Sequence, residues 1–288
     1  MTGDEVDDRA LEGDHVIERI LVPLDGLAEN ETAVPVALSI AAQIGSTVEL
    51  VSVISSGLEA ADKADLAAVA EHYGGGADVR VLAGDDVGQQ LLDEARREGT
   101  LVCMSSAGRG ALGEALLGSV SADLVRHSPR PVLLIGPNSG HELIGRRLAI
   151  AVDGTPYAET VVPHAIVLAD ALRLEPWLYH VVPNEAEHAP DSVGSSYTAP
   201  TSDQPRTLNY ELLYDRRPQR ALIELSRRPE IAMVALTTHG AHPFDRLFAR
   251  SIVPAVVHRS ATPVLVFHPS MPRTLVAASV DPTARPQM

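Results

Sequence analysis

Aromatic side chains are scarce in this chain, where Phe, Trp and Tyr make up only 3% of 288 residues. Few rings are therefore present to stack on bases or sugars, as single-strand nucleic-acid binders require. There is also only one cysteine, Cys103, and it lies in an apolar run. An intrachain disulfide is excluded, and a single buried thiol fits a reducing cytoplasm, which is where we expect the protein.

Basic residues and long apolar runs are lacking as well. The 23 Lys and Arg residues face 38 Asp and Glu residues, which gives a formal net charge of −15 and argues against binding of nucleic acid. Apolar runs fall short of the roughly 20 residues that cross a bilayer, so no membrane partner is expected. Residues 1–15 are acidic and have no apolar h-region, which is unlike a signal peptide.

The chain does contain a repeat of itself. The run Arg19–Gly26 returns 128 residues later as Arg147–Gly154, with Asp-Gly at the end of both runs. Further on, Ser119 returns as Ser251, which is 132 residues later. Such register indicates a duplicated domain of about 130 residues.

Each copy alternates short apolar runs with segments of helical spacing. This alternation predicts a parallel sheet that has helices on both faces, in a doubly wound α/β domain. In the first copy, strands are expected at 19–24, 47–54, 78–82, 100–104 and 131–135, and helices at 29–44, 58–73, 86–97 and 119–127.

The predicted organisation is two tandem domains with short flanking segments. The segment 184–205 departs from the repeat, because it is rich in Pro, Ser, Asp and Gly, and we expect a loop there in place of a helix. The predicted limits are a disordered acidic N-terminus (1–14), copy one (15–136), a linker (137–146), copy two (147–269) and a loose tail (270–288).

Candidate ligand-binding residues of copy one follow its strands, because open parallel sheets bind ligands beyond the carboxyl ends of their strands. Asp25, after the first strand, can accept hydrogen bonds from an adenine amino group or a ribose hydroxyl. Val53, in the second strand, is apolar enough to cover an adenine face. Asp25-Gly26 taken alone also fits an ordinary turn after a strand.

A glycine pair and a helix start follow the fourth strand. Gly118 and Ser119 stand directly before a helical segment, with Ser119 as the expected N-cap, and a helix start of this kind binds anions. Gly108 and Arg109 form a flexible turn from which the arginine could reach a phosphate. A common loop-to-helix cap and a solvated loop charge are the alternative interpretations.

These residues together resemble the nucleotide motif of the universal stress protein family in its tandem form. That motif is Gly, two residues, Gly, nine residues, then Gly-Ser or Gly-Thr. Here Ser105 replaces the first glycine, while Gly108, Gly118 and Ser119 keep their places. The resemblance covers both copies and also includes the Asp25-Gly26 turn and the terminal phrase 127–135.

The resemblance implies a fold, a ligand and a role. It implies two Rossmann-like domains, each with a five-stranded parallel sheet in the order 3-2-1-4-5, which associate through their last strands at 132–135 and 264–267. It implies ATP as the cofactor, with Mg²⁺ carried on the phosphates. The implied binding residues are Asp25, Val53, Ser105, Gly108, Arg109, Gly118, Ser119 and Val120. The implied role is a cytoplasmic stress-response regulator that acts through an unknown protein partner, and a homodimer through the last strands is a further expectation.

Copy two keeps the pattern of the fold but departs from the motif. Thr237 replaces its first glycine, and Arg250 stands where the glycine of Gly-Ser belongs. The arginine either blocks the pocket or contacts a phosphate, and we favour the block. In copy one, Ser105 weakens binding if its backbone needs a positive φ, and adds a phosphate contact if it does not.

Two rival functions remain open at this point. A nucleotide-independent interaction module of the same fold is one, because both copies depart from the glycine motif. An enzyme is the other, but no Ser-His-Asp or Cys-His constellation is readable, so at most very slow ATP hydrolysis is expected. The histidines of copy two fit no metal-ligand spacing, and no metal site is expected.

Overall fold

The computed structural model describes residues 17–54, 59–106, 117–140, 142–154, 161–183, 196–199, 206–238 and 245–268. The acidic N-terminus (1–14) and the tail (270–288) lie outside these residues, so the predictions made for them stay predictions.

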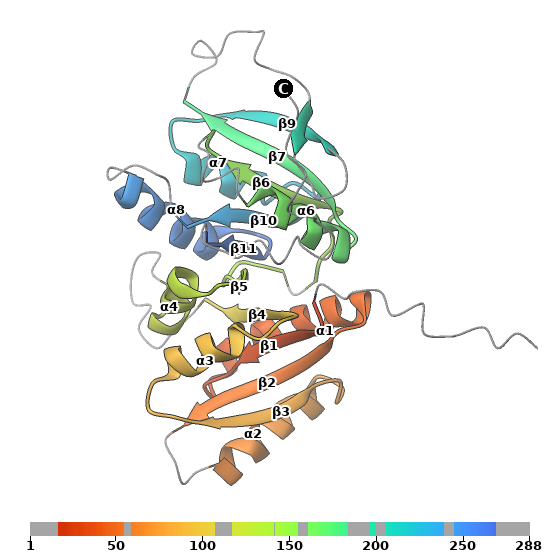
Figure 1. The fold of residues 1–288 in the computed structure, drawn as a ribbon, viewed down its shortest axis with the longest axis vertical. Coiled ribbons are helices and arrows are strands. Elements are labelled where there is room, and N and C mark those ends of the chain that lie inside the picture. The colour runs from red at the N-terminus through yellow and green to blue at the C-terminus, as the bar shows by residue number, and fades with distance from the viewer. Residues whose placement is uncertain are drawn as a thin grey trace, which may run out of the picture.

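Copy one is a doubly wound α/β domain with the predicted strand order (Figure 1). Its five strands are all parallel and follow the order β3-β2-β1-β4-β5. They are β1 (Arg19–Pro23), β2 (Thr47–Ile54), β3 (Asp78–Ala83), β4 (Thr100–Ser105) and β5 (Val132–Ile135). The helices are η2 (Ala28–Thr32, a 3-10 helix), α1 (Ala33–Ile44), α2 (Glu59–His72), α3 (Val87–Ala95) and α4 (Ser119–His127).

Copy two repeats this order and adds one strand. Its sheet runs β11-β10-β6-β7-β9, and the extra strand β8 pairs antiparallel with β9 at the outer edge. The strands are β6 (Arg147–Val152), β7 (Glu175–Val182), β8 (Ser196–Ala199), β9 (Arg206–Tyr214), β10 (Ile231–Thr237) and β11 (Val264–Phe267). The helices are α6 (Val162–Ala171), α7 (Pro218–Leu225) and α8 (Asp245–Arg259).

The loop predicted at 184–205 therefore needs a correction. Residues Ser196–Ala199 of that segment form β8, because an antiparallel edge strand needs only a short β-branched or aromatic run such as Tyr197-Thr198. The rest of the segment lies outside the described residues.

Helices cover both faces of the sheet because side chains alternate along each strand. Ile20 and Val22 of β1 face one apolar layer, which contains α1, α2 and α6. Leu21 faces the other layer, which contains α3, α4, α7 and α8. Each layer runs through both copies, so the chain has one continuous core on either side of the sheet. No helix of the described residues is long and apolar enough to cross a membrane.

The two copies join through their last strands, as the resemblance implied. β5 pairs antiparallel with β11, with Val132 opposite Val266 and Leu134 opposite Val264, and this pairing makes one 11-stranded sheet (Figure 1). β5 also pairs with β4, and β11 with β10, so both edges of each strand are used within the chain. A homodimer stays a prediction, and backbone pairing of these strands is not open to it.

The linker after β5 fixes the two copies to one another. Asn138 Nδ2 donates to the His258 carbonyl oxygen at 2.8 Å, and Gly140 N donates to that of Ala261 at 3.0 Å. Gly136 lies so close to α8 that a Cβ there would fall well inside the radius of the Val257 carbonyl oxygen. Glycine at 136 is thus a condition of the close approach.

A cluster of partly buried ion pairs lies beside α3 of copy one. Glu49 of β2 and Glu94 of α3 receive hydrogen bonds from Arg19 and Arg80, and each glutamate side chain is only 15% exposed. Burial acts to raise the pKa of Glu94, but hydrogen bonds from Arg80, Arg97 and Arg19 outweigh it and lower the pKa to about 2. The cluster connects three strands to α3 at the amino end of the sheet.

Glu94→Gln is expected to lower the free energy of unfolding near neutral pH by about 2 kcal/mol, because charge-assisted hydrogen bonds are lost. The folded-state pKa lies below the ordinary value of 4.5, so this stabilisation is present above pH 4.5 and is lost as the pH falls towards 2. Urea unfolding followed by circular dichroism, at about pH 7 and about pH 3, measures the difference.

Asp93→Asn is the control, because Asp93 pairs with Arg96 at an exposed position and is expected to contribute less than about 0.5 kcal/mol. A Glu94→Gln protein as stable as the wild type at neutral pH would contradict the assignment.

Gly136→Ala is expected to loosen the junction between the copies, because the new methyl group and the Val257 carbonyl oxygen cannot occupy the same space. Calorimetry should then show the single unfolding transition split into two, with the first at a lower temperature. Gly140→Ala is the matched control, since the nearest atom to its Cβ would be 3.8 Å away. Equal transitions for both variants would show that the junction tolerates a side chain at 136.

Candidate functional site

Three adjacent strands of copy one end at the candidate site. β1 is hydrogen-bonded to β2 on one side and to β4 on the other, so the strand order reverses beside β1. Asp25 follows β1, Val53 lies near the end of β2, and Ser105 is the last residue of β4. The structure thus brings these three predicted residues to one edge of one sheet, the position where open α/β sheets bind ligands.

Asp25 is exposed and sits in a turn that its own side chain organises. Its Oδ1 atom accepts a hydrogen bond from the Leu27 amide at 3.2 Å and from Asn30 Nδ2 at 2.8 Å. Gly26, the next residue of this turn, has a φ of +78°. Glycine adopts this conformation without strain because it lacks a Cβ. The carboxylate therefore has a defined direction before any ligand is bound.

Ser105 is buried, and its hydroxyl is turned towards η2. It donates to the Asn30 carbonyl oxygen at 2.8 Å and lies 2.7 Å from Thr32 Oγ1. Since the single Ser105 proton goes to Asn30, Thr32 is the donor in the second bond. Among the described residues, Arg173 is the one non-glycine at positive φ. Ser105 is therefore not at positive φ, and its Cβ causes no backbone strain. Its hydroxyl connects the end of β4 to η2 through these two hydrogen bonds.

Asn30 is the site residue that sequence reasoning missed. It is 8% exposed, and its Oδ1 atom is buried with no hydrogen-bond partner in the described part of the chain. We expected a helix from residue 29, but residues 28–32 form a 3-10 turn and α1 begins at Ala33. The polar run at 29–32 before an apolar stretch was the available signal, because Asn favours turns over helix interiors.

The helix start at 118–120 lies next to the end of β4. The Gly118 amide donates to the Ser106 carbonyl oxygen at 3.4 Å, so the start of α4 is bonded to the residue that follows β4. Gly118 is the N-cap of α4, and the prediction of Ser119 was wrong by one residue, because Ser119 already has helical backbone geometry. Gly108 and Arg109 lie outside the described residues.

The start of α4 has the features of an anion site. In α4, which the structure describes throughout, no side chain caps the helix start and the first turn contains no acidic residue. The amides of Ser119 and Val120 are among the first four of the helix, which have no partner within it. The positive end of the helix dipole adds to their attraction for an anion.

Copy two differs at this position in its backbone. α8 begins at Asp245, which places Arg250 and Ser251 inside the helix, whereas their counterparts in copy one lie at a helix start. Amides beyond the first four residues of a helix bond to carbonyl groups of the preceding turn. Arg250 and Ser251 therefore offer no amide to a phosphate. The Arg250 side chain is outside what the structure describes.

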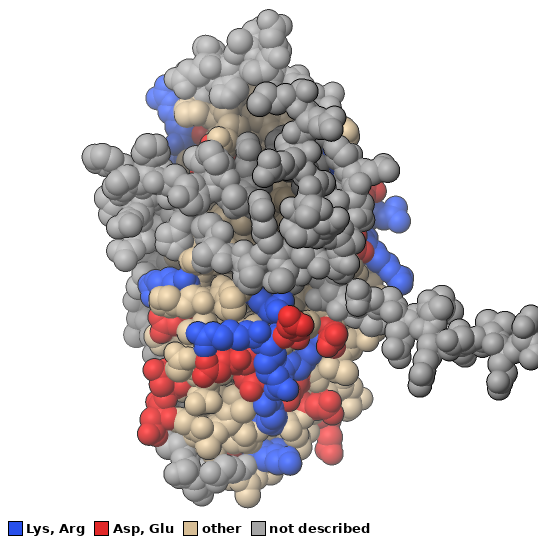
Figure 2. Space-filling view, viewed as in Figure 1, with Lys and Arg blue, Asp and Glu red and all other residues tan. Residues whose placement is uncertain are grey.

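The charges and the cysteine of the described residues add little to the site. Basic and acidic side chains are intermixed over the face of copy one in Figure 2, and they form no patch of one sign there. The described residues contain no group of three or more His, Cys, Asp or Glu side chains that could hold a metal. Burial raises the pKa of the Cys103 thiol far above its usual range, so this cysteine is unreactive.

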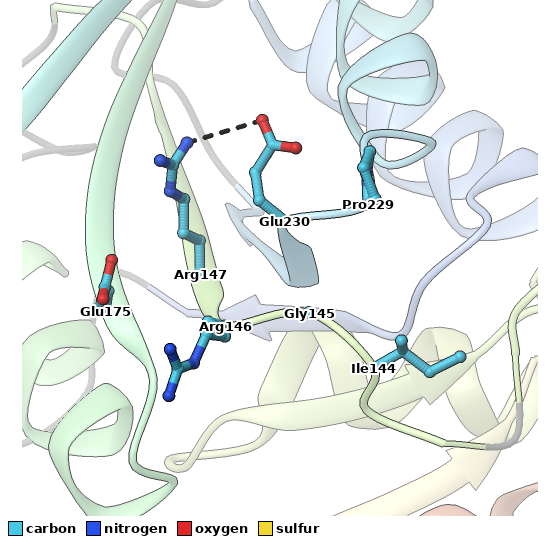
Figure 3. A pocket seen from close by; sticks show the side chains of 7 residues that line it. All are labelled: Ile144, Gly145, Arg146, Arg147, Glu175, Pro229 and Glu230. Carbon is cyan, nitrogen blue, oxygen red and sulfur yellow. Dashed lines mark ion pairs between the residues drawn. The ribbon is translucent and has the colours of Figure 1, made fainter.

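A separate hollow of about 520 Å³ lies at the amino ends of β6 and β10 in copy two (Figure 3). It contains Arg146 and Arg147 together with Glu175 and Glu230, so the charges of the two signs balance. Arg147 forms an ion pair with Glu230 at 3.5 Å and stacks on Trp177, with 3.8 Å from its guanidinium carbon to the ring centre. These contacts give Arg147 a structural role, and we assign no ligand to this hollow.

The fold defines a class of protein: two doubly wound α/β domains in tandem, joined through their last strands, with a candidate ligand site at the strand ends of the first. The family model described as the universal stress protein family matches residues 56–136 and 145–268, which together are more than half of the chain. The chain belongs to the universal stress protein family.

Relatives of known family are similar over part of the chain. A universal stress protein of Mycolicibacterium smegmatis is 24% identical over 64% of this chain and 67% of its own length. Universal stress protein Rv2005c of Mycobacterium tuberculosis is 26% identical over 60% of this chain and 63% of its own length. The chain thus spans about two thirds of the relatives that it matches.

A solved structure supports the fold. The universal stress protein from Archaeoglobus fulgidus superposes with a TM-score of 0.59 and 17% identity, over 88% of this chain and 98% of that one.

Ser105→Ala is expected to lower the free energy of unfolding by about 1–3 kcal/mol, because the buried Asn30 carbonyl oxygen and Thr32 hydroxyl lose their partner. Urea unfolding followed by circular dichroism measures the change. Ser119→Ala, at an exposed position, is the control and should stay near the wild type. No loss of stability in Ser105→Ala would mean that these two hydrogen bonds do not hold β4 to η2.

Proposed function

We propose that this protein binds ATP in copy one and acts as a cytoplasmic stress-response regulator without substantial catalysis. The observation that carries the proposal is the meeting of an oriented carboxylate, Asp25, and an uncapped helix start, Gly118–Val120, at the carboxyl ends of adjacent strands. The family's glycine motif, of which copy one keeps three of four positions, supports the same ligand. The free, buried thiol of Cys103 supports a reducing compartment.

The proposed pose divides the nucleotide between two sets of residues. Adenosine lies between the Asp25 carboxylate, which accepts hydrogen bonds, and the Val53 side chain, which covers a face of the base. The phosphates lie at the amides of Ser119 and Val120, beside Gly118, whose missing side chain leaves room for them. Gly108 and Arg109, which are assigned from the sequence motif, also contact the phosphates. Mg²⁺ is carried on the phosphates, and Ser105 lies next to them at the end of β4.

One nucleotide per chain follows from the difference between the copies. In copy two the helix already includes positions 250 and 251, so the amides that would bind phosphate are bonded within α8. This argument does not depend on where the Arg250 side chain points.

Slow turnover at most is part of the proposal. Hydrolysis needs a group that positions water near the terminal phosphate. The described residues that adjoin the start of α4 in the sequence are serines, glycine and apolar side chains, and none of these is a general base at neutral pH.

A nucleotide-independent interaction module is the second candidate. One observation favours it: the Ser105 hydroxyl stands at the family's first glycine and is bonded to Asn30 and Thr32, so the site departs from the motif. The ATP-binding measurement below decides between the two candidates.

ATP titrated calorimetrically into the wild-type chain is expected to bind with a stoichiometry of one. Gly118→Arg should abolish binding, because a side chain then fills the space at the helix start that a phosphate needs. Gly140→Arg is the matched control, since it adds the same charge at an exposed glycine of the linker and should leave binding intact.

Arg250→Gly tests the reason for which copy two is proposed to bind no nucleotide. The stoichiometry should stay at one, because the helix, and not the arginine side chain alone, uses the amides. A stoichiometry of two in the wild type would contradict the assignment of a single site. Absence of binding in the wild type would reject ATP and leave the interaction module.

A further inference from the structure

Asn30 connects two of the strand ends that form the proposed site. Its Nδ2 atom donates to Asp25 Oδ1 at 2.8 Å, and its main-chain carbonyl oxygen accepts from Ser105 Oγ at 2.8 Å. The Ser105 hydroxyl also accepts from Thr32, so η2 is bonded to the end of β4 at two points. The Asp25 carboxylate is thereby held by a residue that is itself fixed to β4.

We propose that Asn30 is a positioning residue of the nucleoside end of the site, where it holds the Asp25 carboxylate in the direction that accepts a hydrogen bond from adenosine. This inference rests on the proposed function, because it requires that Asp25 meets the nucleoside. It assigns a role to a residue outside the glycine motif, and Asn30 itself need not touch the ligand.

The state of the Asn30 amide separates this role from a purely structural one. One half of the amide is bonded to Asp25, while the other half, Oδ1, is buried without a partner among the described residues. A buried acceptor without a donor is destabilising, so the side chain is a poor choice for stability alone. What Asn30 does supply is a donor aimed at the exposed Asp25 carboxylate.

The second copy carries the corresponding change already. Ala158 stands 128 residues after Asn30, at the shift that relates Asp25 to Asp153. Copy two has no helix start at the position that corresponds to Gly118–Val120, and it also lacks the asparagine. The two features occur together in copy one, as expected if both serve one ligand.

The experiment measures the affinities of adenosine, ATP and tripolyphosphate by calorimetry for the wild-type chain and for Asn30→Ala. Loss of the Asn30 donor leaves the Asp25 carboxylate less firmly held, since the Leu27 amide remains on Oδ1. The affinities for adenosine and ATP should then fall by the same factor, about tenfold. Tripolyphosphate affinity should not change, because the start of α4 is untouched. The melting temperature should stay the same or rise, since the unpartnered oxygen is removed.

Asn30→Asp should bind adenosine more weakly than Asn30→Ala, because it replaces the donor with a second negative charge beside Asp25. Asn138→Ala is the matched control: it removes a bonded amide from the linker and should leave all three affinities unchanged. If Asn30→Ala does not fold, the comparison of adenosine with tripolyphosphate is made on Asn30→Asp.

Two results would overturn the inference while the proposed function stands. One is wild-type adenosine affinity in Asn30→Ala. The other is an equal loss of affinity for adenosine and tripolyphosphate, which marks general damage to the fold. A wild-type chain that binds no ATP would instead reject the proposed function, and the inference with it.

Discussion

The pairing of β5 with β11 is the contact on which the rest of the molecule depends. It joins two five-stranded parallel sheets into one sheet and makes the apolar layer on each face continuous. Each strand is buried and has both edges bonded, so neither copy can lose the contact without exposing backbone groups and apolar side chains to water. The repeat is thus a means of supplying each copy with a permanent partner.

Most of the fold was predictable because it rests on periodic patterns. The strand at 47–54 and the helix at 119–127 have the predicted limits, since apolar alternation and a glycine before the helix mark their ends. β8 was missed because a run of four residues is too short to show a periodic pattern. The start of α8 at Asp245 departs from the repeat, in which Ser251 corresponds to Ser119, the first residue of α4.

The site was predictable in part for the same reason. That Asp25, Val53 and Ser105 lie near one another was predictable because strand ends of a parallel sheet meet at one edge, while their role in binding stays a prediction. The contacts of Asn30 could not, because they depend on a 3-10 turn in a run that has the composition of a helix start. A hydroxyl's direction, such as that of Ser105, is set by neighbours far away in sequence and has no local signal.

The two copies have kept their fold and changed the chemistry beneath it. Arg19 of β1 pairs with Glu49 in copy one, whereas its counterpart Arg147 stacks on Trp177 at the same register of the sheet. Trp177 is the single tryptophan of the chain, so its fluorescence reports on copy two alone. A ligand held in copy one changes that emission only if its effect crosses the junction between the two copies. Trp177 is thus an intrinsic fluorescence probe of whether ligand binding in copy one affects copy two.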